Sequence, residues 1–126
     1  MDYKILIADD EPEIRNLLRL YLENENYHVI EAEDGQRALD LLRAEQPALC
    51  ILDIMMPKID GYTATRVIRS TNRQDAKVIP IIAMTANAFS EDIQHSLAAG
   101  MNAHIAKPIS IDAIMEVLDQ IFDRRK

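Results

Sequence analysis

The sequence has 126 residues, 48% of them hydrophobic, which is enough for one compact domain and too short for two, so we expect residues 1–126 to form a single domain. Its net charge of −7 disfavours nucleic-acid binding, which needs a basic face, and suits a domain that holds cations or meets a basic partner. There is neither an apolar run long enough to cross a bilayer nor a signal-peptide pattern at the start, so we expect no membrane contact and a cytoplasmic location.

The first half of the chain alternates apolar strands with amphipathic helices. The first strand ends in three acids, Asp9-Asp10-Glu11, and Asp10 is one candidate for the N-cap of the next helix. The strand before Asp53 is apolar without alternation, as in a strand buried on both faces. In chain order this half predicts a strand at 4–8, a helix from Pro12, a strand at 28–32, a helix opened by Asp34-Gly35 and stopped by Pro47, and a strand at 48–52.

The second half repeats this pattern. Its fourth strand is rich in β-branched residues and ends at Thr85, and its fifth is short and ends before Lys107. Residues 70–77 are polar and are expected to form a surface loop. In chain order this half predicts a helix at 62–69, a strand at 78–84, a helix from Ser90 that Gly100 closes, a strand at 103–106 and a helix capped by Ser110.

Five strands alternating with five helices predict a mostly parallel sheet with helices on both faces. All strand carboxyl ends then lie on one edge, where such sheets bind their ligands. The second strand ends in Ala32-Glu33 and is expected at the border of the sheet. The polar residues expected to converge at the other strand ends are Asp9, Asp10, Asp53, Thr85 and Lys107.

Carboxylates gathered at one place repel one another, so a positive group must hold them. Oxygen ligands without histidine or cysteine favour a hard divalent cation, Mg²⁺ first and Mn²⁺ as a substitute. Lys107 adds a fixed positive charge and Thr85 adds a hydroxyl donor. This set predicts a phosphoryl-transfer site in which Asp53 is the nucleophile that forms an aspartyl phosphate.

Four motifs follow the strand ends: Ala8-Asp9-Asp10-Glu11, Asp53-Ile54-Met55-Met56-Pro57 with Gly61, Met84-Thr85-Ala86 and Lys107-Pro108-Ile109. With these motifs, the whole chain resembles the receiver domain of two-component response regulators, of the chemotaxis-regulator type. The resemblance implies a flavodoxin-like, doubly wound α/β fold with strand order 2-1-3-4-5, and a phosphoacceptor signalling domain rather than an enzyme. The stretch 84–89, with 98–101 and 107–109 beyond it, looks most like receivers attached to hybrid sensor kinases.

The resemblance also implies the roles of the acidic residues. Asp53 would accept a phosphoryl group from a histidine kinase or a histidine phosphotransfer protein. Asp9 and Asp10 would hold Mg²⁺, directly or through water, with Asp53 and the backbone carbonyl of Met55 as further ligands.

Thr85 and Lys107 would contact the phosphoryl oxygens, and the peptide bond between Lys107 and Pro108 would be cis. The switch of the family pairs the threonine with an aromatic residue three positions before the lysine, where this chain has His104. Two interpretations of His104 stay open. It either turns inward behind Thr85, with a weaker or pH-dependent coupling, or simply packs at the edge of its strand.

Met55 and Asn87 lie where the family tunes the gain and loss of the phosphoryl group. Met55 offers no polar group to position an attacking water, so we expect a long-lived phosphorylated state, measurable as a hydrolysis half-life. Phosphorylation would bias an equilibrium between two conformations. An output partner, which the sequence does not identify, or a second copy in a dimer would meet the fourth helix, fifth strand and fifth helix.

Three alternatives remain on the same fold. A flavin- or nucleotide-binding module needs glycines after the first strand, but Asp9-Asp10-Glu11-Pro12 repels anions. A dehalogenase-like phosphatase needs a second aspartate at the position of Met55. A receiver that only binds a partner is disfavoured by the complete acidic set. His28 and His95 are interpreted as ordinary surface residues.

Overall fold

Five parallel strands form the single sheet of the computed structural model, which describes residues 3–86 and 90–122. The strand order is β2-β1-β3-β4-β5, so the predicted doubly wound α/β fold is confirmed, and β2 lies at an edge as expected. The strands are β1 (Lys4–Ala8), β2 (His28–Ala32), β3 (Leu49–Asp53), β4 (Ile81–Thr85) and β5 (Ala103–Ala106).

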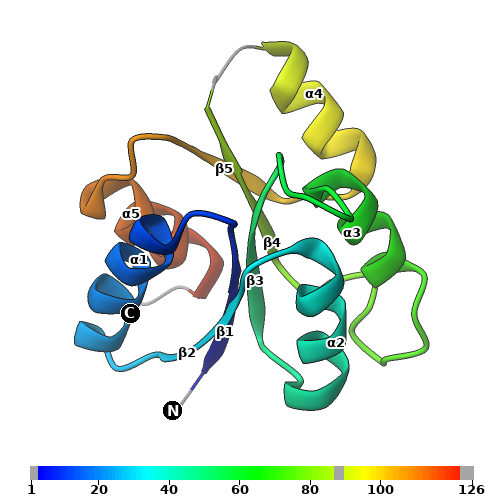
Figure 1. Cartoon of the computed structure of the whole chain (residues 1–126), viewed down its shortest axis with the longest axis horizontal. Helices are drawn as coiled ribbons and strands as arrows, with labels where there is room; N and C mark the ends of the chain where they lie inside the picture. The colour runs from blue at the N-terminus through cyan, green and yellow to red at the C-terminus, as the bar shows by residue number, and fades with distance from the viewer. Residues whose placement is uncertain (1–2, 87–89, 123–126) are drawn as a thin grey trace.

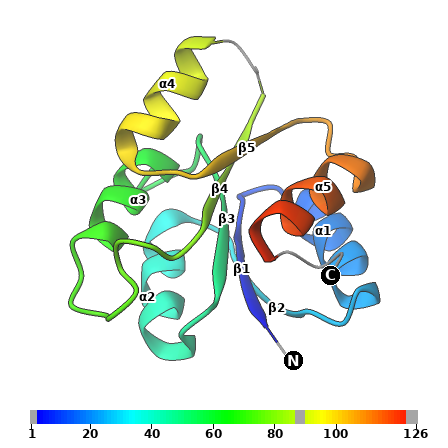
Figure 2. The ribbon, with the colours of Figure 1, turned by 180° about the vertical axis from the view of Figure 1, so that it is seen from behind.

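Helices cover both faces of this sheet (Figure 1). α1 and α5 lie on one side, and α2 and α3 lie on the other with α4 beside α3, as the view from behind also shows (Figure 2). Within the described residues, none of these helices has the length and apolar character to cross a membrane. They are α1 (Pro12–Asn24), α2 (Gly35–Glu45), α3 (Gly61–Arg69), α4 (Ser90–Ala99) and α5 (Ile111–Phe122).

Alternate residues of each central strand fill two separate cores. In β1, Leu6 and Ala8 pack under α2 and α3, whereas Ile5 and Ile7 pack under α1 and α5. β3 and β4 alternate in the same way, and every residue in these two strands is buried. The sheet is therefore a rigid platform, and its strand ends hold polar groups in fixed positions.

Aspartates cap the starts of two helices on the α2–α3 side. The Asp34 carboxylate accepts a hydrogen bond from the Arg37 N–H at 2.8 Å, and the Asp60 carboxylate accepts one from the Thr63 N–H at 2.8 Å. Because Asp60 is the cap, α3 begins at Gly61, one residue before the predicted start.

The N-cap of α1 is Glu11, so the alternative that placed Asp10 there is wrong. The side chain of Glu11 does not cap the helix; instead the Glu11 N–H donates to the Asp9 carboxylate at 2.9 Å. Asp10 therefore stays exposed beside the strand end.

The fourth strand begins later than the sequence pattern predicts. β4 starts at Ile81 rather than at residue 78, and Val78 is 73% exposed. The N–H groups of Val78 and Ile79 both donate to the Asp75 carbonyl in a turn. Pro80 has no N–H for the sheet ladder, although its carbonyl accepts from the Cys50 N–H at 3.0 Å. β-Branched composition alone does not reveal this turn.

Arg69, the last residue of α3, ties this turn to the start of β5. Its guanidinium donates to the Ile79 carbonyl at 2.7 Å, to the Gly100 carbonyl at 2.6 Å and to the Asn102 side chain at 2.9 Å. The Asn102 side-chain oxygen in turn accepts from the Ile81 N–H at 2.9 Å. One side chain therefore joins three segments that are far apart in the sequence.

We expect Arg69→Met to lower the free energy of unfolding by about 1 to 2 kcal/mol, because backbone carbonyls lose a charged donor and water replaces it only in part. Urea denaturation followed by circular dichroism measures the change. Arg66→Met, at an exposed position one turn earlier in the same helix, is the control and is expected to change stability little. Equal loss in both variants would show that the Arg69 hydrogen bonds do not stabilise the fold.

Candidate functional site

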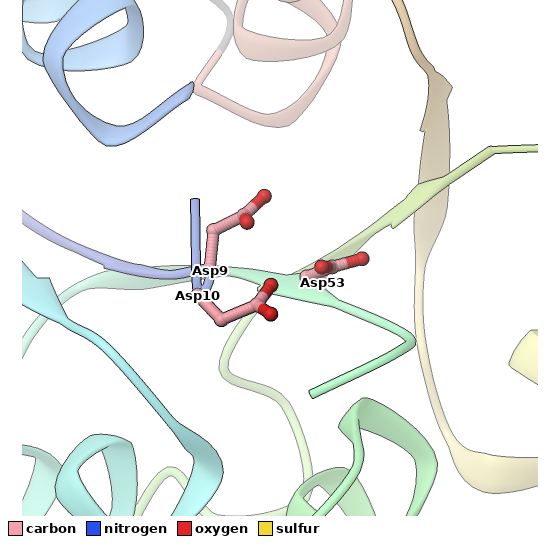
Figure 3. A group of neighbouring side chains, drawn as sticks. All are labelled: Asp9, Asp10 and Asp53. Carbon is pink, nitrogen blue, oxygen red and sulfur yellow. The ribbon is translucent and has the colours of Figure 1, made fainter. Parts of the chain in front are cut away.

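Three aspartates gather at the carboxyl ends of β1 and β3 (Figure 3). The register pairs Ala8 with Leu52, so the next residues, Asp9 and Asp53, lie side by side at the edge of the sheet. One carboxylate oxygen from each of Asp9, Asp10 and Asp53 lies within 4.8 Å of the other two. Asp9 is fully buried and Asp53 is 5% exposed, whereas Asp10 is exposed.

Lys107 brings a positive charge to these carboxylates from the end of β5. Its backbone N–H donates to the Thr85 carbonyl at 2.8 Å, which fixes the residue beside the end of β4, and the bond to Pro108 is cis. The Lys107 Nζ lies 3.0 Å from Asp9 Oδ2 and 3.4 Å from Asp53 Oδ2. It also lies 3.4 Å from Glu11 Oε1. A single ammonium thus faces several carboxylates.

The hydrogen bonds of the two buried carboxylates leave room for a cation. Asp9 Oδ1 accepts from the Glu11 N–H at 2.9 Å, and Asp53 Oδ1 accepts from the Met55 N–H at 3.3 Å. Asp9 Oδ2 is buried and has no well-directed hydrogen bond within the described residues, although Lys107 is close. Three carboxylates that face one ammonium keep an excess of negative charge, and this oxygen-only set fits a hard divalent cation such as Mg²⁺.

Burial dominates the electrostatics of the site. It raises the pKa of Asp53 to about 6, with a further increase from the charge of Asp9, and Lys107 opposes both effects. Burial likewise raises the pKa of Asp9, against the Glu11 N–H and Lys107. Burial alone would lower the pKa of Lys107, but its contacts with the two aspartates outweigh burial and raise it. Burial therefore makes both carboxylates easier to protonate than a free aspartate, and a bound cation would oppose this effect.

Of the other residues singled out in the sequence, Thr85 is buried at the end of β4 and Met55 is 76% exposed beside Asp53. His104 is exposed on β5 and is not among the described residues that line the cavity at the aspartates. The pairing of its ring with Thr85 stays a prediction. Asn87 lies outside the described residues.

A cavity of about 570 Å³ opens above the aspartates, and two of its lining residues were not expected there. Tyr62 of α3 and His95 of α4 both line it, with their ring centroids 6.1 Å apart in an edge-to-face arrangement. His95 is exposed, as the sequence suggested, yet it borders the site. Nothing in the local sequence marks it, because its position depends on how α4 packs beside α3.

The family model for the response regulator receiver domain matches residues 5–119. Response regulator GtcR of Aneurinibacillus migulanus is 39% identical over 122 residues, which are 96% of this chain and 48% of GtcR. The chain thus spans about half the length of that relative.

Solved structures agree with this match. The receiver domain of sensor histidine kinase PA1611 from Pseudomonas aeruginosa, solved with a magnesium ion coordinated in its active site cleft, is 32% identical with a TM-score of 0.84 and covers 95% of this chain and 97% of that one. Chemotaxis protein CheY4 of Vibrio cholerae is 26% identical with a TM-score of 0.88, covering 95% and 98%. By sequence match and by fold, this chain belongs to the response regulator receiver domain family of two-component systems.

Proposed function

We propose that the chain accepts a phosphoryl group on Asp53 and passes the signal on by changing conformation. The observation that carries this proposal is the grouping at one edge of the sheet. The buried Asp53 carboxylate lies beside Asp9 and Asp10, with the Lys107 ammonium 3.4 Å away. A carboxylate held among acids and one fixed cation suits nucleophilic attack on phosphorus better than general acid–base work.

The donor would be the phosphohistidine of a histidine kinase or of a histidine phosphotransfer protein. One Asp53 carboxylate oxygen attacks the phosphorus and forms a P–O bond. The P–N bond of the donor breaks, and its electron pair leaves with the imidazole nitrogen, which takes up a proton. Lys107 stabilises the negative charge of the transferring oxygens, and the Thr85 hydroxyl donates to one of them.

The side chains of Asp9, Asp10 and Asp53 and the backbone carbonyl of Met55 would hold Mg²⁺, for which Mn²⁺ would substitute. The grouping of the three carboxylates and the Mg²⁺ in the PA1611 receiver support this assignment. When bound, the cation neutralises carboxylate and phosphoryl charge. Asp9 and Asp10 then keep it next to Asp53, the attacking group.

The remaining assignments concern the chain once it is phosphorylated. Met55 and Asn87 would tune the lifetime of the phosphorylated state, and Thr85 with His104 would couple it to the surface formed by α4, β5 and α5. That surface would meet an output partner or a second copy. The chain would work in the cytoplasm as one domain, without binding nucleic acid itself.

The first test is intact mass spectrometry after incubation with acetyl phosphate and Mg²⁺. We expect the wild type to gain one phosphoryl group, because the small donor needs only the acidic site. Asp53→Asn removes the nucleophile, and chelation of Mg²⁺ removes the cation, so each is expected to abolish the gain. Asp40→Asn, at an exposed position in α2, is the matched control and should retain it.

A gain that persists in Asp53→Asn would move the acceptor to another residue. If the wild type gains nothing, even with a histidine kinase as donor, the chain acts as a binding module on the same fold.

A further inference from the structure

Arg15, in the first turns of α1, contacts the backbone of the metal-site residue Asp9. Its Nη1 donates to the Asp9 carbonyl oxygen at 2.7 Å, and its Nε donates to Glu31 Oε1 at 3.1 Å. The Arg15 side chain is 18% exposed and that of Glu31 is 23% exposed, so both groups are shielded from water on most sides. The contact is to the Asp9 backbone and not to its carboxylate.

The contact completes a clamp on Asp9. The Asp9 N–H donates to the Ala32 carbonyl of β2 at 3.1 Å. The Asp9 carbonyl is tied to the same strand through Arg15 and Glu31. Both peptide groups that flank the Asp9 Cα are therefore anchored to β2, one directly and one through an ion pair.

We propose that Arg15 is a positioning residue for the divalent-cation site. The clamp fixes the Asp9 backbone, and the Glu11 N–H holds Asp9 Oδ1, so the Asp9 carboxylate keeps one orientation relative to Asp10 and Asp53. Without Arg15, the Asp9 peptide is free to rotate and the carboxylate samples other directions. This inference rests on the proposed function, because it assumes that Asp9 binds Mg²⁺.

The geometry explains why arginine is needed. Its fork reaches the Asp9 carbonyl and the Glu31 carboxylate at once, whereas the ammonium of a lysine is a single point charge. Arg19, one turn later, pairs with the other oxygen of Glu31 at 2.6 Å and with Glu23 at 3.2 Å. Arg19 therefore shares the Glu31 partner but no hydrogen bond to Asp9 is described for it, which makes it a matched control.

The test is Mg²⁺ binding measured by isothermal titration calorimetry on the unphosphorylated chain. We expect Arg15→Met to raise the Kd for Mg²⁺ roughly tenfold, the lower end of the range for residues that orient a metal ligand. Arg15→Lys should fall between wild type and Arg15→Met, and Arg19→Met should stay within about twofold of wild type. Arg19→Met should also keep the wild-type rate of phosphorylation by acetyl phosphate, because Arg19 is described in contact with Glu31 and Glu23 only.

Two results would overturn the inference. One is an Arg15→Met variant that is less stable but binds Mg²⁺ as tightly as wild type, because the arginine is then purely structural. The other is an equal loss of Mg²⁺ affinity in Arg15→Met and Arg19→Met, which would show that the effect comes from removing a positive charge and not from the hydrogen bond to Asp9. If Arg15→Met fails to fold, the Mg²⁺ affinity of Arg15→Lys is compared with those of the wild type and Arg19→Met in the same way. Failure of the wild type to bind Mg²⁺ would instead contradict the proposed function.

Discussion

Gly35→Ala is expected to destabilise the domain by about 3 kcal/mol, the upper end of the usual range for overpacking a buried site. Gly35 is the first residue of α2, and a Cβ there would lie 1.9 Å from the Ile59 carbonyl oxygen and 2.8 Å from the Ile59 carbonyl carbon. These atoms belong to the backbone of the loop between β3 and α3, so no side-chain rotation relieves the clash. Either α2 or the loop after Asp53 must move.

Urea denaturation at neutral pH measures this change. Gln36→Ala, one residue further along α2 and exposed, is the control and should stay within about 0.5 kcal/mol of wild type. If the Gly35→Ala variant remains folded, we expect it to bind Mg²⁺ more weakly, because the displaced loop carries the Met55 carbonyl that we propose as a Mg²⁺ ligand. Wild-type stability in Gly35→Ala would show that the loop gives way at little cost.

Asp53→Asn is expected to stabilise the metal-free domain at pH 8. The pKa of Asp53 is raised from 3.8 to about 6, mainly by burial, so the folded state holds a proton that the unfolded state releases. Folding stability contributed by this group is present below pH 3.8 and is lost as the pH rises toward 6. The shift corresponds to about 3 kcal/mol, which we reduce to about 2 kcal/mol because the cavity is open to solvent.

Chemical denaturation in a chelator at several pH values tests this expectation. The advantage of Asp53→Asn should grow between pH 4 and 6 and level off above that range. Added Mg²⁺ should reverse the order, since the wild type gains binding energy that the variant lacks. An advantage that does not change with pH would contradict burial of the Asp53 charge as its cause.

The strand ends could be predicted from the sequence because a buried strand is a short apolar run that stops at a polar residue. Apolar runs stop at Asp9 and Asp53, and shorter strand-like segments stop at Thr85 and Lys107. Because parallel strands end at one edge of the sheet, these four residues were predicted to lie together there. The start of β4 was not predictable from composition. Val78 and Ile79 have the residue types of a strand, and only the turn to Asp75 and the missing N–H of Pro80 exclude them.

Contacts that depend on packing angles were also beyond the sequence. Arg15 reaches Asp9 because α1 packs against β1 and β2, and His95 reaches the cavity because α4 packs beside α3. An arginine on an amphipathic helix and a histidine on another are ordinary surface residues by pattern. Their neighbours come from other elements, and no local spacing encodes them.

Because residues of β3 alternate between two cores, this strand tolerates substitution better than insertion. One extra residue before Asp53 would exchange Cys50 and Ile51 between the two faces of the sheet. The same slip would turn the Asp53 carboxylate away from Asp9. An exchange of one aliphatic residue of β3 for another of similar volume is therefore expected to cost less than a change in the length of the strand, because a change in length also moves Asp53.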